Sequence, residues 1–350
     1  MKIRPALPGC RWKIRFLLLG WMSSLAAQSP VAPAPSVATA SSVECRFQRI
    51  TPAPDLAELI ATARTQIAHW RQDLKTATKV ESTRAAMANL AINLLLRSNR
   101  WEASGNDLAA AGLRKFVKSA LADADWRLQA ISAQGDVGAL EARLAWLRSA
   151  TTVDATALCA VAEKGASLGG AEASYRRVFC VSDAAQKLSA MRAAAALGHP
   201  AAMEAVGRLC LQGEHPEACA VRDLCRAAQS GRVAAASALG WRLTLPGTNG
   251  DLQAGRQWLQ YAAENADVAA MNNLGELIER TQRDAAGRQL ASDWYRRAAV
   301  SGLPEAMINR ARLLAAGNAD DCAEARRWLQ QALASGLAAA QISLSALACH

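Results

Sequence analysis

The sequence has few aromatic residues and no segment with the alternation typical of a β-strand. Aromatic residues make up 5% of its 350 residues, and only four of them are Phe and three are Tyr. A half-buried strand would show alternating apolar and polar positions, and no useful stretch of that kind occurs. The chain is instead rich in Ala, Leu, Arg and Gln, which favour helices. The composition therefore predicts an all-α protein.

Motifs for catalysis and for metal binding are also missing from the sequence. There is no Gly-rich phosphate loop, no GxSxG, no HExxH and no CxxC, and the four His residues are far apart. Asp320 and Asp321 stand where a helix should begin, and acidic residues are favoured there as caps. We therefore predict no catalytic residue, no metal site and no cofactor.

The N-terminal apolar run is too short to span a membrane. Phe16 to Ala27 is about 12 residues long, whereas a spanning helix needs ~20. The run follows a basic leader and ends in small residues, which predicts a signal peptide over residues 1–27; an uncleaved anchor is the alternative. Residues 28–53 are expected to form a Pro-, Ala- and Ser-rich tether. The chain is thus expected to be exported, to the periplasm, with no membrane attachment besides the export signal.

The charge of the mature chain is mild. Loss of the predicted signal peptide removes five basic residues and no acids, which lowers the formal net charge from +10 to +5. The remaining Arg residues are spread along the predicted helices beside acids. A nucleic-acid partner is therefore not expected, although weak attraction to acidic envelope polymers remains an option.

A repeat of 33 to 36 residues runs through the C-terminal half. A period of this length is typical of stacked helical hairpins. Each copy holds two helix-length segments, and the small residue between hairpins predicts a left-handed helix cap. Small residues four and nine positions after it are expected to let two helices approach closely, and Trp eight positions before it to fill the space between hairpins. We number each copy from this residue as position zero: Gly198, Gly231, Ala266, Gly302 and Gly336.

The repeat resembles the Sel-1-like repeat, a relative of the tetratricopeptide repeat. The best copy runs from Ala266 to Ala299, with AAMNNLGELI followed by ASDWYRRAA. The resemblance is firm over about residues 155–350, and we assign the array to 131–350. Most of the usual Tyr residues and the Gly-x-Gly turn are missing. The resemblance implies an α-solenoid, a right-handed superhelix of αα-hairpins.

Residues 54–130 also read as helices, with apolar residues recurring at helical spacing. An open solenoid end needs a cap, so we interpret this region as a divergent capping region. Divergent repeats and a separate partner-binding bundle are the alternatives.

Eight Cys residues remain after loss of the predicted signal peptide, and an even number in an exported chain indicates disulfides. They allow 105 pairings. The repeat register favours Cys210–Cys219 and Cys322–Cys349, with Cys159–Cys180 as a weaker third pair. Cys45 and Cys225 are what is left. Buried free thiols are the alternative.

The first helices of such arrays commonly line a concave groove. Positions seven and ten share one helical face, and they carry a mixture of amides, charges and one aromatic residue. An ordinary exposed helix face would look the same. The predicted groove residues are Arg208, Trp241, Asn273, Glu276, Asn309 and Arg312.

These features together predict a non-catalytic scaffold or adaptor in a bacterial envelope. The resemblance implies protein–protein interaction, so the expected partner is an envelope protein or a peptide segment of one. Two alternatives remain: a cell-wall or glycan binder, and a β-lactam-binding or β-lactam-hydrolysing protein, because some exported members of the resembled family have that activity.

Overall fold

The computed structural model describes residues 45–48, 50, 55–76, 80–150, 152–212, 217–246, 251–315 and 317–347. The predicted signal peptide lies outside the described residues, as does most of the predicted tether. Residues 41–350 form one compact unit, and its described part contains helices and no strands. The helices are α1 (Leu56–Lys75), α2 (Val80–Ala103), α3 (Asp107–Ala120), α4 (Asp125–Ala133), α5 (Val137–Leu147), α6 (Ala155–Ser167), α7 (Ala171–Arg177), α8 (Ala184–Ala196), α9 (Pro200–Leu211), α10 (Glu217–Gln229), α11 (Val233–Thr244), α12 (Leu252–Glu264), α13 (Val268–Thr281), α14 (Ala285–Val300), α15 (Pro304–Leu314), α16 (Ala319–Ala334) and α17 (Ala339–Ala346), with a 3-10 turn, η1 (Ala122–Ala124), before α4.

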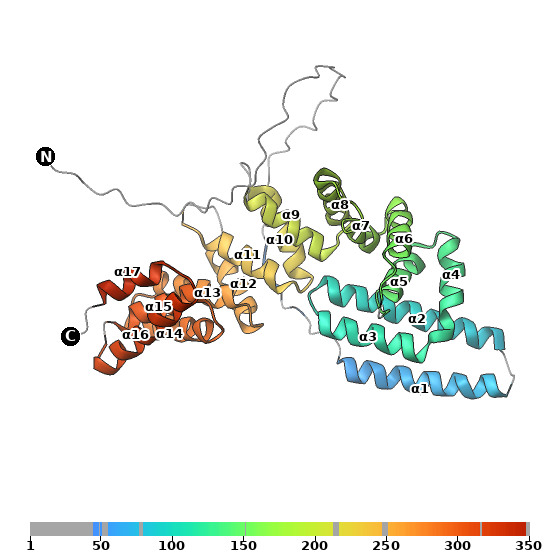
Figure 1. Cartoon of the computed structure of the whole chain (residues 1–350), viewed down its shortest axis with the longest axis horizontal. Coiled ribbons are helices and arrows are strands. Elements are labelled where there is room, and N and C mark those ends of the chain that lie inside the picture. The colour runs from blue at the N-terminus through green and yellow to red at the C-terminus, as the bar shows by residue number, and fades with distance from the viewer. Residues whose placement is uncertain are drawn as a thin grey trace, which may run out of the picture. The chain divides into compact units, whose positions relative to one another are not determined.

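From α4 to α17, consecutive helices pack against each other (Figure 1). The odd-numbered helices from α5 follow a position-zero residue or its equivalent, and we call them first helices; the even-numbered helices are second helices. This arrangement is an α-solenoid of stacked αα-hairpins, so the predicted fold class is confirmed.

The N-terminal helices share a core with the start of the array. Helix α1 packs on α2 and α3, and α2 packs on α3 and α5. One apolar cluster contains Leu95 of α2, Leu113 of α3 and Ala142 of α5, all fully buried. Helices α2, α3 and α4 therefore pack against α5, and the capping role of residues 54–130 stays a prediction.

The turn between consecutive hairpins has the left-handed cap that the sequence predicts. All five position-zero residues have positive φ, including Ala266 at 65°. At Gly198 the backbone N–H groups of Gly198 and His199 donate to the carbonyls of Ala195 and Ala194, at 3.0 and 2.9 Å. This pair of bonds is the Schellman motif, which satisfies the last carbonyls of the second helix.

The small residues after the turn allow close helix packing. The Ala residues at position four are fully buried: Ala202, Ala235, Ala270, Ala306 and Ala340. At position nine, a Cβ on Gly240 would lie 2.8 Å from the backbone nitrogen of Leu259. The first helix and the second helix of one hairpin are therefore in near backbone contact here.

The Trp residues at position minus eight are less uniform than predicted. Trp258 is fully buried, but Trp294 and Trp328 are only half-buried. In the repeat of Trp294 the neighbouring Tyr295 is buried instead and fills the space against Gly275. Trp294 lies under Arg297 of its own helix, whose guanidinium is 4.2 Å from the ring centroid. Trp294 and Trp328 pack against the core only in part, so the expectation that Trp fills the space between hairpins holds in full for Trp258 alone.

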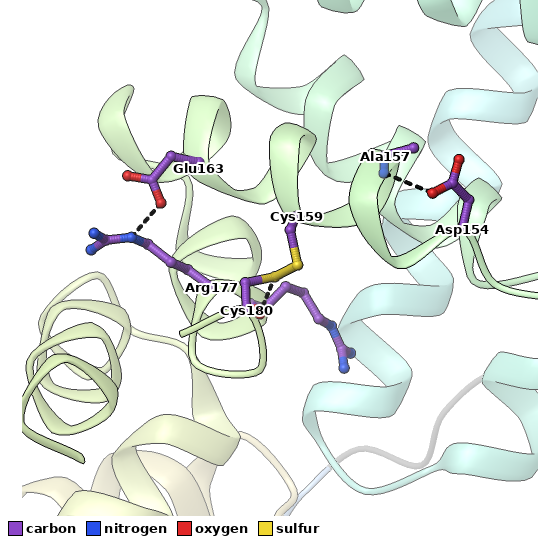
Figure 2. Close-up of a disulfide and its surroundings, with 7 residues drawn as sticks. Asp154, Ala157, Cys159, Glu163, Arg177 and Cys180 are labelled. Atoms are coloured by element: carbon purple, nitrogen blue, oxygen red, sulfur yellow. Dashed lines mark hydrogen bonds and ion pairs between the residues drawn. A yellow bond between two sulfur atoms is a disulfide. The ribbon is translucent and has the colours of Figure 1, made fainter. Parts of the chain in front are cut away.

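Two disulfides join elements of this unit. Cys159 of α6 is bonded to Cys180 beyond α7, with Cα atoms 5.5 Å apart, as the register suggested (Figure 2). Cys45 is bonded to Cys225 of α10, with Cα atoms 5.8 Å apart. Cys210 and Cys322 are also disulfide-bonded. Their predicted partners, the side chain of Cys219 and residue Cys349, lie outside the described residues.

The end of the predicted tether lies on the array. Cys45 is 6% exposed, and the ring of Phe47 meets Trp258 of α12 edge-on with centroids 4.9 Å apart. Phe47 also lies 6.2 Å from the ring of Tyr261. Residues 45–48 therefore form a packed strap, anchored covalently at Cys225.

Candidate functional site

The first helices form the surface on which the sequence analysis predicts a groove. Neighbouring first helices touch directly, α9 with α11 and α11 with α13. All six predicted groove residues lie on α9, α11, α13 or α15. We call the solvent-facing side of these four helices the first-helix face.

The structure gives the six predicted residues different environments. Asn273 and Glu276 of α13 are half-buried, and their side chains make no hydrogen bond or ion pair with a described residue. Arg208 pairs with Glu204 at 3.0 Å, and Trp241 is half-buried against the core. Among the six predicted residues, the polar side chains without a hydrogen bond or ion pair to a described residue are thus the two on α13.

Side chains of α15 tie this face to α13. Asn309 donates to Oδ1 of Asn272 at 3.0 Å. Arg312 forms a bidentate pair with Glu279, at 2.7 and 2.6 Å. Glu279 also accepts from the hydroxyl of Tyr295 at 3.1 Å. Two of the predicted groove residues therefore bridge adjacent repeats.

The pair of Arg312 and Glu279 changes the titration of its neighbours. The hydrogen bond from Arg312 lowers the pKa of Glu279 despite partial burial. Burial and the nearby charge of Glu279 raise the pKa of Tyr295. The Tyr295 hydroxyl therefore stays protonated and serves as a hydrogen-bond donor at neutral pH.

A buried ionic cluster joins α2, α3, α5 and α7 to the start of α9. Glu172 Oε1 accepts from Arg176 at 2.5 Å and from Arg148 at 3.3 Å. Glu102 accepts from Arg176 at 2.8 Å and from Arg114 at 2.6 Å, and it also pairs with Arg148. We call this set the buried cluster: Glu102, Arg114, Arg148, Glu172, Arg176 and His199.

Both carboxylates of the buried cluster are ionised at neutral pH. Burial raises the pKa of Glu102, but the hydrogen bond from Arg148 and the charge of Arg176 outweigh it and lower the pKa from 4.5 to about 2. For Glu172, burial is likewise outweighed by His199 and Arg176, so its pKa is also lowered. Each charge is therefore compensated inside the protein, as a buried ion must be.

His199 links the buried cluster to the N-terminus of α9. Its Nδ1 accepts from the backbone N–H of Ala202 at 3.4 Å, which assigns the proton to Nε2. Nε2 then donates to Glu172 Oε2 at 2.9 Å. Tyr175 stacks on the ring with centroids 4.2 Å apart. Both ring nitrogens are engaged, so the group positions α7 against α9.

A cavity of about 1370 Å³ opens beside this cluster, between the C-terminal half of α2 and the turns that start α7, α9 and α11. We call it the α2 cavity. Asn93, Arg97, Asn99 and Arg100 line it from α2, and Val233 lines it from α11.

The end of α2 is fixed against the array next to this cavity. The Arg232 guanidinium donates to the carbonyl of Ala103 at 3.1 Å and to Glu204 at 2.5 Å. Arg232 is the N-cap residue of α11. The wall that α2 supplies is thus attached at a point 129 residues away in the sequence.

Asn99 is an unusual part of this wall. It is 4% exposed, its Nδ2 donates to the carbonyl of Glu141 at 2.8 Å, and its Oδ1 has no hydrogen-bond partner among the described residues. A buried unpaired acceptor costs roughly 1–3 kcal/mol. Glu141 lies beside it, and burial raises the pKa of that carboxyl.

Neither a metal centre nor a membrane-spanning helix occurs among the described residues. They hold no cluster of three or more His, Cys, Asp or Glu side chains suited to a metal ion. In the same part of the chain, no helix is both long and apolar enough to cross a membrane.

Known proteins resemble this chain in fold rather than in sequence. No family model and no curated protein matches the sequence. A solved structure of a protective antigen present in uropathogenic Escherichia coli strains, which displays an SLR fold, superposes with a TM-score of 0.54 at 19% identity. The chain adopts the Sel1-like repeat (SLR) fold.

The SLR match covers 81% of this chain and 60% of that antigen, so the chain spans less than two thirds of its length. A Sel1 repeat protein from Oxalobacter formigenes is 20% identical, with a TM-score of 0.47, and the match covers 63% of this chain and 96% of that protein.

Sequence reasoning missed the α2 cavity and the buried cluster. Glu102 lies on α2, before the array, while Glu172 and His199 lie in different repeats, and none belongs to a catalytic or metal-binding motif. One sequence feature could have pointed to the buried cluster. Some first helices have a charged residue at a position where most other copies have a small apolar residue. Glu172, for example, stands at position three after Gly169, where four of the five numbered copies have Ala.

Proposed function

We propose that the mature chain is an exported, non-catalytic scaffold of the bacterial envelope, located in the periplasm, which binds a protein segment on its first-helix face. The observation that carries this is the contrast between neighbours on α13. Asn272 and Glu279 are engaged by α15, whereas Asn273 and Glu276 keep free polar groups at half-exposed positions. Free amide and carboxylate groups on a rigid helix are suited to fixing an extended peptide.

The disulfides support export. Cys45–Cys225 and Cys159–Cys180 need an oxidising compartment, which the cytoplasm does not offer. A glycan ligand would favour exposed aromatic side chains on this face, but Trp241 is half-buried against the core. A protein ligand therefore fits this face better.

In vivo cross-linking of the tagged, exported chain, followed by affinity capture and mass spectrometry, tests the proposal. We expect one dominant envelope protein, which is lost when Asn273 and Glu276 are both changed to Ala. Gln253→Ala with Gln257→Ala is the matched control, because both side chains are exposed on the second helix α12. Capture that survives the α13 changes, or that fails equally in the control, would contradict binding on the first-helix face.

A further inference from the structure

Arg97 and Arg100 of α2 line the α2 cavity without an acidic partner. They lie three residues apart and so share one face of the helix. Neither side chain makes a hydrogen bond or an ion pair with a described residue, whereas the arginines of the buried cluster are all paired. A guanidinium is always charged and binds carboxylates through two parallel hydrogen bonds.

The acids near the cavity do not neutralise these two arginines. Glu172 is already compensated by Arg148, Arg176 and its bond to His199. Glu141 accepts from the backbone N–H of Glu172 at 3.0 Å, and so caps the start of α7. The positive charge of Arg97 and Arg100 is therefore available to a ligand.

The other groups that line the α2 cavity indicate which class of ligand it can bind. Leu96 and Val233 supply apolar surface to the same cavity. Asn99 Oδ1 is an acceptor in need of an N–H donor. A peptide offers carboxylates, apolar side chains and backbone N–H groups together. A polyanionic polysaccharide offers only the first of these in quantity.

We propose that the α2 cavity is a second binding site, which holds an acidic segment of the protein partner by its carboxylates on Arg97 and Arg100. This inference rests on the proposed function, since it names the chemistry of the same partner. The first-helix face and the α2 cavity then contact different parts of one ligand. Binding here weakens with salt, because the pairs with Arg97 and Arg100 are partly exposed.

Fluorescence anisotropy on the oxidised, mature protein tests this. The probe is a fluorescein-labelled hexapeptide of alternating Glu and Leu, and the reference probe has Gln in place of Glu. We expect the acidic probe to bind more tightly, and Arg97→Gln with Arg100→Gln to weaken it about tenfold. Arg192→Gln with Arg256→Gln is the matched control, because these arginines make no ion pair with a described residue and lie outside the cavity.

The outcomes separate this inference from the proposed function. Equal loss in the cavity and control variants would overturn it, since it would mean general attraction to a basic protein. Polygalacturonate that displaces the acidic probe from the wild type and binds more tightly than it would overturn it in favour of a polysaccharide. Partner capture that needs Asn273 and Glu276 but not Arg97 and Arg100 would also overturn it, while leaving the proposed function standing. Unchanged thermal melting of Arg97→Gln with Arg100→Gln checks that the helix is intact in the variant whose binding is measured.

Discussion

Replacing Glu172 by Gln removes one charge from the buried cluster while keeping the size of the side chain. The Glu172 side chain is 5% exposed and is shared by Arg148, Arg176 and His199. Removing one partner of a buried ion pair typically costs about 3–5 kcal/mol, because the other charge is left uncompensated. Arg148 and Arg176 keep their bonds to Glu102, so we expect a loss at the lower end, about 3 kcal/mol.

The chain offers a matched control one helix away. Glu163 pairs with Arg177 at 2.5 Å, but the two side chains are 61% and 36% exposed (Figure 2). Exposed pairs contribute about 0–1 kcal/mol, so Glu163→Gln should cost less than about 1 kcal/mol. The same substitution in the same type of pair therefore isolates the effect of burial.

The assay is urea unfolding of the oxidised protein, followed by helical circular dichroism and by hydrogen exchange. Hydrogen exchange is needed because a repeat array opens locally, and the loss should be concentrated in α5, α7 and α9. Similar small losses for Glu172→Gln and Glu163→Gln would refute the claim that the buried cluster holds these helices together.

Other parts of the structure lead to four further predictions. The folded pKa of Glu102, about 2, lies below its usual 4.5. The stability that this group contributes above pH 4.5 should therefore be lost as the pH falls toward 2, by up to about 3 kcal/mol in unfolding measured across pH; a flat profile would contradict it. Gly240→Ala should destabilise by about 2 kcal/mol in urea, because the new Cβ would meet the Leu259 backbone at 2.8 Å; no change would mean that the helices move apart freely. Ala266→Gly should raise the free energy of unfolding by about 1 kcal/mol, since φ is 65° there and Gly is unstrained at that angle. A lower free energy of unfolding would mean that the left-handed backbone of Ala266 is not a source of strain. Cys45→Ser should cost about 2–5 kcal/mol and release the strap to limited proteolysis, and an equally resistant strap would show that Phe47 suffices.

The repeat register was predictable because it depends on local chemistry. Gly198 and its equivalents have left-handed φ, and the Ala residues around them are buried, as the spacing indicated. Asp320 and Asp321 stand in the first turn of α16, where Asp321 completes a capping box with Asn318. Each of these features is settled within one or two helical turns, so a single sequence carries it.

The candidate sites were less predictable. The six groove residues were chosen by register alone, and their role remains a prediction. The register could not show that Asn309 and Arg312 would reach back to Asn272 and Glu279 on the neighbouring helix. A side chain's partner across repeats depends on how far adjacent hairpins rotate, and the repeat pattern does not encode that angle.

The sequence by itself determined the class of fold and the positions of the left-handed caps between hairpins, because periodicity and capping act over a few residues. The tertiary structure alone decided that α2 folds against the turn before α11 and is held there by Arg232. It also decided that Glu102, Glu172 and His199 share one buried cluster, and that Cys45 is bonded to Cys225 across 180 residues. Such contacts depend on the summed geometry of many packed helices, so they cannot be predicted from a local sequence pattern.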